Sequence, residues 1–132
     1  MVKTLAIALV FVSTAAFAAS QKLSGNQIQQ HIIGNTLAGT ENGSPYFEYF
    51  AAYGVIMGRG KDGEYLGNWT IRGDKLCVAY EDDNGNIAGI HKCSYIFVNG
   101  RQVTGSSIDE DDPLTIEQGN PRNLTVPTSG DD

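Results

Sequence analysis

The chain has 132 residues and a formal net charge of −6, with 15 acidic residues against 9 Lys and Arg. This length suits one domain with a single modest core. Binding to nucleic-acid phosphates needs clustered basic residues, and the sequence has no such cluster, so we expect no nucleic-acid partner.

The first residues have the pattern of an export signal. Met1–Lys3 is a short basic start, Leu5–Val12 is an apolar core, and the three residues ending at Ala18 have the small-x-small form of a cleavage site. Cleavage after Ala18 and cleavage after Ala19 both fit this pattern. The apolar core of about eight residues is far shorter than the roughly 20 that a membrane span needs. We therefore predict a periplasmic or secreted protein with no membrane span in its mature form.

The composition divides the rest of the chain into a body and a tail. Removal of the signal takes away Lys3 and leaves 8 basic and 15 acidic residues. Residues 106–132 hold 7 of these acidic residues and only one basic residue, Arg122. We predict three parts: a signal peptide at 1–19, a single β-rich domain at 20–124, and a disordered tail at 125–132.

One short helix is signalled near the start of the domain. Ser24 is a good N-cap, and Gln27 three residues later completes a capping box. Leu23 and Ile28 stand at the two positions of a hydrophobic staple. These signals predict a helix over residues 25–33 that needs tertiary packing to persist.

The following segment has the pattern of an antiparallel β-meander. Turn dipeptides and β-forming residues recur along it, in a chain that contains 16 glycines. We expect a mainly β fold, in which the meander curls into a small sheet or barrel with one short N-terminal helix. The predicted strands are 46–50, 54–59, 64–72, 75–81, 87–98 and 101–105.

Turn chemistry suggests the register of two strand pairs. Gly73-Asp74 suits a two-residue hairpin turn, and Asn99-Gly100 suits another, which would place Ile96 opposite Val103. Both registers bring the apolar residues of the paired strands to one side. The predicted core face is Tyr65, Trp69, Ile71, Leu76, Val78, Tyr80, Ile96, Val98 and Val103.

The two cysteines, Cys77 and Cys93, are predicted to form a structural disulfide, because an exported chain folds in an oxidising compartment. If they face each other, the hairpin between them is centred on Gly85, with an odd-length loop or one bulge. A loop of this size would add about 3 kcal/mol of stability by the chain-entropy argument. The alternative is a redox-active or metal-binding pair, but the spacing is far from Cys-x-x-Cys.

The face that carries this disulfide has a candidate surface patch, formed by His91, Tyr95 and Phe97. This face is too apolar to be bare surface. We expect the helix at 25–33, or the curling of the sheet itself, to cover it. The alternative is a surface that binds a ligand or a partner protein.

We find no candidate for catalysis, metal binding or cofactor binding. The chain has only two histidines, and the loop after Glu81 lacks the glycine that a calcium loop requires at its sixth position. No nucleophile motif or phosphate-binding loop is present. Glu48 and Glu81 could be imagined as paired carboxylates, but we interpret both as ordinary residues of a polar strand face.

Several short segments stand in order along the chain: Leu23–Ile28, Gly34–Thr36, Tyr49-Phe50 with Gly54, Gly67–Trp69, Leu76–Val78, Cys93 with Tyr95, and Gly119–Pro121 ahead of Leu124. Together they resemble a family of small exported proteins of Gram-negative bacteria that is known only as a domain of unknown function. The resemblance implies a small curled β-sheet or barrel with a lead-in helix and a strand that bears a tryptophan. It also implies that Pro113–Leu124 forms a last strand, and it assigns no catalytic residue. The acidic run Asp109–Asp112 departs from the pattern, and we interpret it as a surface loop.

These observations favour a non-catalytic binding or interaction module, with no cofactor. Its partner would be an unknown small molecule or a protein of the cell envelope. A ligand would lie in the mouth or interior of the curled sheet, facing Trp69, Tyr80 and Tyr65. The alternative is an enzyme that acts in the envelope, or an inhibitor of one.

Overall fold

The computed structural model describes residues 20–87, 91–106 and 112–127. The predicted signal peptide, most of the acidic run at 109–112, and the last five residues lie outside this range. The described chain contains one α-helix and nine strands: β1 Gln21–Lys22, α1 Gly25–His31, β2 Thr36–Glu41, β3 Ser44–Phe50, β4 Val55–Gly60, β5 Gly63–Arg72, β6 Lys75–Tyr80, β7 Lys92–Asn99, β8 Gln102–Gly105 and β9 Leu114–Glu117.

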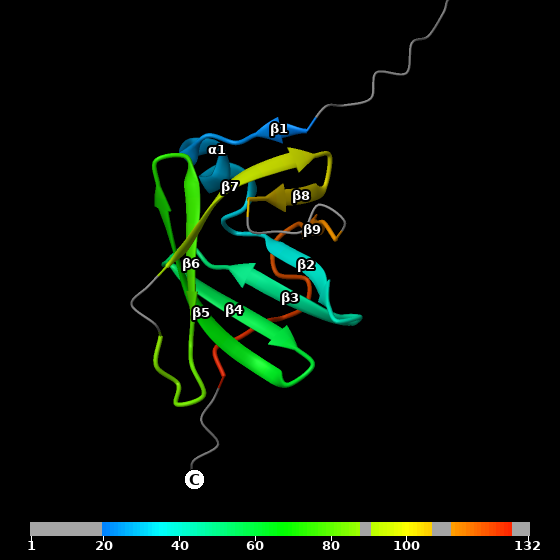
Figure 1. Cartoon of the computed structure of the whole chain (residues 1–132). Helices are drawn as coiled ribbons and strands as arrows, with labels where there is room; N and C mark the ends of the chain where they lie inside the picture. The colour runs from blue at the N-terminus through cyan, green and yellow to red at the C-terminus, as the bar shows by residue number, and fades with distance from the viewer. Residues whose placement is uncertain (1–19, 88–90, 107–111, 128–132) are drawn as a thin grey trace, which may run out of the picture.

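Strands β2 to β9 form a closed antiparallel barrel. Each strand pairs with the next along the chain, and β9 returns to pair with β2, which closes the ring. Figure 1 shows these strands wrapping around a common interior. The short strand β1 adds to the outside of β7 through the pairs Gln21–Val98 and Lys22–Phe97. The predicted mainly β fold with one short helix is therefore confirmed, and the sheet closes.

Helix α1 forms as the capping signals predict. Ser24 Oγ accepts a hydrogen bond from the Gln27 backbone N–H, and the Gln27 side chain accepts one from the Ser24 backbone. The helix is two residues shorter than predicted, because it ends at His31 with Ile32 as its C-cap. It packs against β5 and β6. Ile28 and Ile32 are fully buried, so the helix fills one end of the barrel. The predicted cover of the disulfide face by this helix is therefore wrong.

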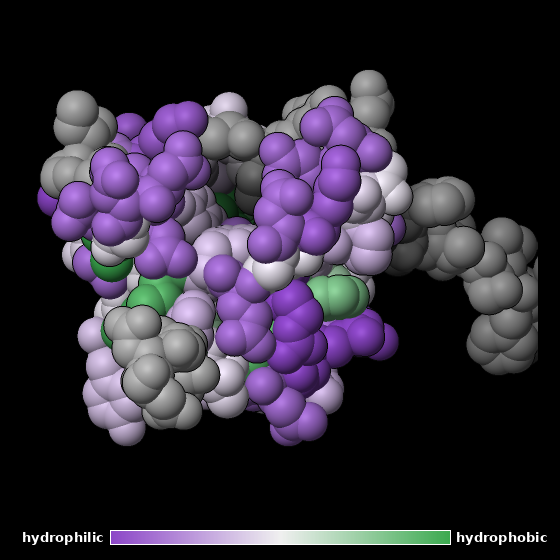
Figure 2. Space-filling view, turned by 90° about the horizontal axis from the view of Figure 1, so that it is seen from below, coloured by the Kyte–Doolittle hydropathy of each residue, from purple (hydrophilic) through white to green (hydrophobic). Residues whose placement is uncertain are grey.

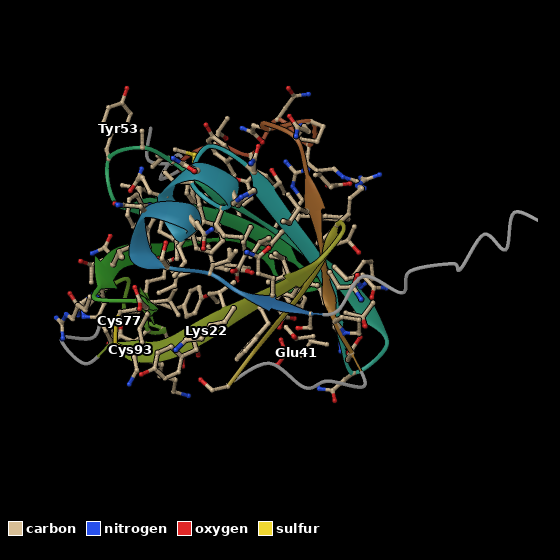
Figure 3. The ribbon with its side chains drawn as sticks, turned by 90° about the horizontal axis from the view of Figure 1, so that it is seen from above. Lys22, Glu41, Tyr53, Cys77 and Cys93 are labelled. Atoms are coloured by element: carbon tan, nitrogen blue, oxygen red, sulfur yellow. A yellow bond between two sulfur atoms is a disulfide. The ribbon has the colours of Figure 1, made fainter. Side chains whose placement is uncertain are left out.

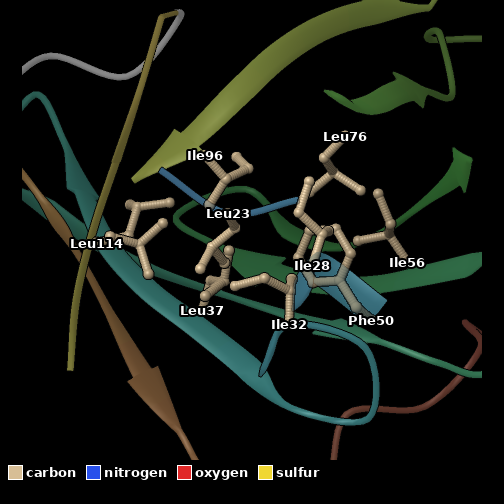
Figure 4. Close-up of a cluster of buried hydrophobic side chains, with 10 residues drawn as sticks. Leu23, Ile28, Ile32, Leu37, Phe50, Ile56, Leu76, Ile96 and Leu114 are labelled. Atoms are coloured by element: carbon tan, nitrogen blue, oxygen red, sulfur yellow. The ribbon is translucent and has the colours of Figure 1, made fainter. Parts of the chain in front are cut away.

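The hydrophobic core lies where α1 enters the barrel. Figure 4 shows Ile28, Ile32 and Leu23 packed among inward side chains of the strands, such as Phe50 and Ile56. The predicted core face is confirmed: seven of its members belong to this core or pack against it, and Tyr65 and Tyr80 also face the interior. The seven are Trp69, Ile71, Leu76, Val78, Ile96, Val98 and Val103.

One of the two predicted registers is correct and the other is wrong. Gly73 and Asp74 form the predicted turn between β5 and β6. The turn between β7 and β8 consists of Gly100 and Arg101. Val103 therefore pairs with Val98, whereas the predicted partner of Val103 was Ile96. Gly100 has a φ of 61°, which suits a glycine that stands first in a two-residue turn. Both registers keep the same side chains inward, so the hydrophobic pattern could not separate them.

The predicted disulfide is confirmed. Cys77 and Cys93 are directly opposite residues of β6 and β7, with their Cα atoms 3.9 Å apart. The strand pairs Cys77–Cys93 and Val78–Lys92 are centred on Gly85, as predicted. Nearer the tip, Glu81 pairs with Ile87 around a five-residue turn, which is an odd-length loop centred one residue earlier. Asp82 Oδ1 accepts hydrogen bonds from the backbone N–H groups of residues 84 and 86, which stabilise this turn.

Two strands and the C-terminal segment differ from the predictions. β1 and β2 are absent from the predicted strands. The last strand is β9, which is much shorter than Pro113–Leu124 and is followed by an irregular segment. There Asn120 and Leu124 exchange side-chain to backbone hydrogen bonds, and Leu124 is buried. Within the described residues, no helix is long and apolar enough to cross a membrane.

Candidate functional site

The two ends of the barrel differ, and the end away from α1 contains a cavity. The turns that join β2 to β3 and β4 to β5, and the loop between β6 and β7, all lie at this end. Figure 2, seen from below, shows hydrophilic side chains gathered around a recess on this side of the molecule. The cavity has a volume of about 310 Å³ and is lined by Leu37, Glu41, Tyr46, Glu48, Phe50, Tyr65, Leu76, Val78, Tyr80, Lys92, Ser94, Ile96 and Leu114.

The central polar group of this cavity is the carboxylate of Glu48. Side chains alternate along β3, so Tyr46, Glu48 and Phe50 all lie on the inner side of the barrel. Glu48 is 8% exposed. Our interpretation of Glu48 as a polar-face residue is therefore wrong: it is an ionisable carboxyl group placed inside an otherwise largely apolar interior.

Two tyrosine hydroxyls hold this carboxylate. Tyr65 Oη donates to Glu48 Oε1 at 2.8 Å, and Tyr80 Oη donates to Glu48 Oε2 at 2.9 Å. The two rings meet edge to face, with their centroids 6.0 Å apart. Tyr80 remains 38% exposed, although its hydroxyl reaches the buried carboxylate. Each carboxylate oxygen thus accepts one hydrogen bond from a neutral donor.

Glycines on neighbouring strands make room for these rings. Gly58 lies directly opposite Tyr65, and Gly67 lies directly opposite Tyr80. A Cβ atom at either glycine would collide with the tyrosine ring. Tyr46 repeats the arrangement over a glycine of β2. Because the rings lie against the barrel wall over glycines, they leave the middle of this end open.

Burial sets the protonation of the site. Removal from water raises the pKa of Glu48, and the hydrogen bonds from Tyr65 and Tyr80 act in the opposite direction. Burial and the nearby Glu48 carboxylate raise the pKa of both tyrosines above the ordinary value. The same two causes raise the pKa of Tyr46 to about 12. All three phenols therefore stay neutral at physiological pH and can act as hydrogen-bond donors.

An acidic vestibule adjoins the cavity. This second hollow, of about 460 Å³, shares Glu41, Tyr46 and Tyr65 with the cavity lining. Among the described residues, its lining contains six acidic side chains and one basic side chain: Glu41, Asp62, Glu64, Glu81, Asp82 and Asp83, with Lys61. A solute that enters the cavity by this route passes a strongly negative rim.

The buried carboxylate has no cationic partner in the described part of the chain. Ion pairs there join Arg59 to Glu64 and Arg122 to Glu117, and neither reaches the cavity. Lys92 also lines the cavity, but it is an exposed residue and forms no ion pair with Glu48. Within residues 20–87, 91–106 and 112–127, no group of His, Cys, Asp and Glu side chains could hold a metal ion.

The structure brings together two of the three residues that we predicted to face a ligand. Tyr65 and Tyr80 meet at Glu48 in the cavity. Trp69 lies further along β5, outside the cavity lining, and packs against the hydrophobic core. Its indole Nε1 donates to the carbonyl oxygen of Ala51 at 2.7 Å. Trp69 is therefore a core residue near the end of the barrel that α1 fills, which we call the plugged end; the end with the cavity is the open end.

The predicted surface patch lies on the outer face of β7 and does not touch the cavity. Tyr95 is 37% exposed, and the ammonium groups of Lys22 and Lys75 lie 3.9 and 4.8 Å from the centre of its ring. His91 and Phe97 are half-buried. Figure 3 shows Lys22 and the disulfide along this outer wall, and Tyr53 pointing away from the body of the protein.

Two of the central residues were not among the predicted site residues. The sequence pattern indicates Glu48 only as a possible half of a carboxylate pair, and it does not indicate Tyr46. The sequence signal that could have revealed the cavity is a tyrosine that pairs with a glycine on the preceding strand. For Tyr46 that signal depended on recognising β2, which the sequence pattern did not reveal.

Glu48, Glu81 and His91 do not line the same hollow. Glu81 accepts a hydrogen bond from the Leu66 backbone and lines the vestibule, whereas Glu48 lies in the cavity. His91 lines neither hollow. In comparisons with known proteins, no family model, curated protein or solved structure matches this chain. The resemblance to the family of unknown function therefore stays a prediction.

Proposed function

We propose that this protein is an exported binding module that holds a small organic molecule in the cavity at the open end of its barrel. The observation that carries the proposal is Glu48, a carboxylate buried inside a cavity that tyrosine–glycine pairs keep open. A core selected only for stability would fill this space with apolar side chains, because close packing and the absence of buried charge both stabilise a fold.

The cavity has the composition of a ligand site. Its volume of about 310 Å³ falls at the lower end of the range for small-molecule pockets, which is roughly 300–1,000 Å³. Apolar side chains such as Leu37 and Ile96 form most of its wall. The polar side chains of the described lining, which could orient a ligand, are Glu48, three tyrosines, Glu41, Lys92 and Ser94.

The proposed location follows from the cysteines and the N-terminal pattern. The disulfide between Cys77 and Cys93 fits an oxidising compartment. Together with the export pattern of residues 1–19, it supports a role in the periplasm or outside the cell. We expect a non-catalytic role, since no histidine is among the described residues of the cavity lining, and the second carboxylate there, Glu41, is exposed.

The test is to block the cavity without changing the rest of the barrel. Val78 lines the cavity, so Val78→Phe should occupy its space. Val126 is half exposed and lies outside the lining, so Val126→Phe is a matched control for added aromatic surface. Ligand-observed NMR with a panel of cationic, neutral and anionic small molecules should find binders whose signal disappears with Val78→Phe and persists with Val126→Phe. The proposal would be contradicted if the binding signal persists with both substitutions, or if no molecule of any charge class binds.

A further inference from the structure

We infer that the ligand is a small organic cation, with an ammonium group that lies beside Glu48 among the tyrosine rings and an apolar body that packs against the aliphatic wall of the cavity. This inference rests on the proposed function and adds the chemical class of the ligand. It depends on four features: the unfilled acceptor capacity of Glu48, the rings around it, the size of the cavity, and the charge of its entrance.

Glu48 can accept more hydrogen bonds than the described chain supplies. A carboxylate has about four acceptor positions, and Tyr65 and Tyr80 fill one on each oxygen. Both donors are neutral, so they orient the Glu48 carboxyl group and bring no positive charge to it. An ammonium group would add donors and the missing positive charge, and a buried charge is stable only when it is paired.

The aromatic rings suit the same group. Tyr65 lies over Gly58 and Tyr80 lies over Gly67, so each ring has one face toward the barrel wall. Both rings also line the cavity, where they meet edge to face. Cations are attracted to the faces of aromatic rings, and this attraction strengthens where water is excluded. A carboxylate bordered by tyrosine rings therefore favours an organic ammonium over an anion or an alcohol.

The cavity limits the size of this cation. Its volume of about 310 Å³ equals about ten times the roughly 30 Å³ that one water molecule occupies in the liquid. A ligand with about ten non-hydrogen atoms would fill it. The aliphatic side chains of Leu76, Ile96 and Leu114 line the part of the cavity that such an apolar body would contact.

The acidic vestibule favours the entry of a cation. Its carboxylates line the hollow that adjoins the cavity, with Lys61 as the one basic side chain among the described lining residues. Like-signed side chains at a cleft raise the local concentration of ions of opposite charge. The same field repels anions. Lys92 is the one cation of the described cavity lining, and it is an exposed residue with no ion pair to Glu48.

The experiment compares three molecules of nearly equal size and different charge. Calorimetric titration of the oxidised protein near neutral pH would use phenethylammonium, 2-phenylethanol and phenylacetate. We expect phenethylammonium to bind at least about tenfold more tightly than the alcohol, and phenylacetate to bind most weakly. Glu48→Gln should reduce the preference for the cation over the alcohol to less than about twofold, while affinity for the alcohol persists. Glu117→Gln, which removes a carboxylate outside both hollows, should leave the preference unchanged.

The outcomes separate this inference from the proposed function. If the alcohol or phenylacetate binds as tightly as the cation, and Val78→Phe abolishes that binding, the cavity binds ligands but the cationic class is wrong. If the three probes fail while other molecules bind in the cavity, the inference again fails alone. If nothing binds, both proposals fail. Should Glu48→Gln not fold, NMR contacts in the unaltered protein decide: protons next to the bound ammonium must lie near the Tyr65 and Tyr80 rings, and contacts elsewhere overturn the inference.

Discussion

The two ends of this barrel are built from the same strands, but one end is filled by apolar side chains and the other contains a polar cavity. At one end, α1 places Ile28 and Ile32 into a closely packed apolar core that includes Phe50. At the other end, the same strands surround a cavity with the buried carboxylate of Glu48. The helix fills the first end, whereas tyrosine rings laid over glycines leave the second end hollow.

The difference shows how a small barrel can divide stability and binding between its ends. Apolar burial at about 25 cal/mol per Å² makes the plugged end the main source of folding energy. The open end contains features that lower stability, namely empty volume and a desolvated charge. Such features persist in a fold when they serve function. Substitutions at the two ends should therefore have different consequences, and the following predictions test that division.

The largest effect is expected at the plugged end. Ile28→Ala removes a fully buried side chain of α1 and should lower the free energy of unfolding by about 2–5 kcal/mol. Gln29→Ala changes an exposed residue of the same helix and should have little effect. Urea unfolding measures both. A loss below about 0.5 kcal/mol for Ile28→Ala would contradict the role assigned to this end.

If Ile28→Ala prevents folding, Ile28→Val gives a smaller step at the same site. It should lower the free energy of unfolding by about 0.5–1.5 kcal/mol. The effects of substitutions at the two ends of the barrel are then compared with Ile28→Val in place of Ile28→Ala.

The second effect concerns the disulfide that ties β6 to β7. Cys77→Ala combined with Cys93→Ala should lower the free energy of unfolding by about 3 kcal/mol, as expected for a closed loop of this length. The two strands also carry Val78 and Ser94 of the cavity wall, so hydrogen exchange should increase more at the open end than in α1. Equal loss of protection at both ends would show that the ends are not independent.

The double variant provides its own control, because reductant should destabilise the unaltered protein and leave the variant unchanged. Intact-mass analysis of the exported protein should show both thiols masked before reduction. Two free thiols under non-reducing conditions would contradict the disulfide.

The third prediction tests the space that glycines provide for the rings. Gly58→Ala would force a Cβ atom into the Tyr65 ring and should lower the free energy of unfolding by about 1–3 kcal/mol. Gly60→Ala, on the same strand, would meet its nearest atoms only at 3.6 Å or more and is the matched control. Unfolding midpoints and the NMR shifts of the Tyr65 ring measure both variants. Equal effects at the two glycines would show that the tyrosine–glycine contact does not shape the cavity.

The sequence revealed the plugged end better than the open end. The capping box of Ser24 and Gln27 is local, so α1 could be predicted to within two residues. The glycine turn at Gly73 is also local, and it defined the register of β5 and β6. Closure of the barrel depends on pairs between distant segments, such as Leu37 with Ile116, which no local signal encodes.

The open end was obscured by the pattern of β3. Residues 46–50 place aromatic side chains on both faces of this strand, so alternation does not indicate which face is inside. The outer face is covered in ways that only the structure reveals: the Arg122 guanidinium lies 4.1 Å from the centre of the Phe47 ring. The sequence pattern therefore predicts Glu48 as a residue of the polar face, although its side chain is the central polar group of the cavity.

The smallest effect, and the most specific, is the pH dependence of stability at Glu48. Burial raises the pKa of Glu48 in the folded protein, so the folded state holds this proton more tightly than the unfolded chain does. Its contribution is fully present below the unfolded pKa and is lost as pH rises through the folded pKa. Glu48→Gln does not titrate, so this variant should become more stable relative to the unaltered protein as pH rises from about 4 to about 8.

Glu117 supplies a control of opposite sign. The Arg122 guanidinium lowers the pKa of Glu117, so its contribution is present above the unfolded pKa and is lost as pH falls. Glu117→Gln should therefore lose stability relative to the unaltered protein as pH rises, by a small amount because the pair is largely exposed. Urea unfolding at both pH values measures the two variants. If the two substitutions shift stability in the same direction, Glu48 does not behave as a desolvated carboxylate. The proposed difference between the plugged end and the open end would then be wrong at Glu48.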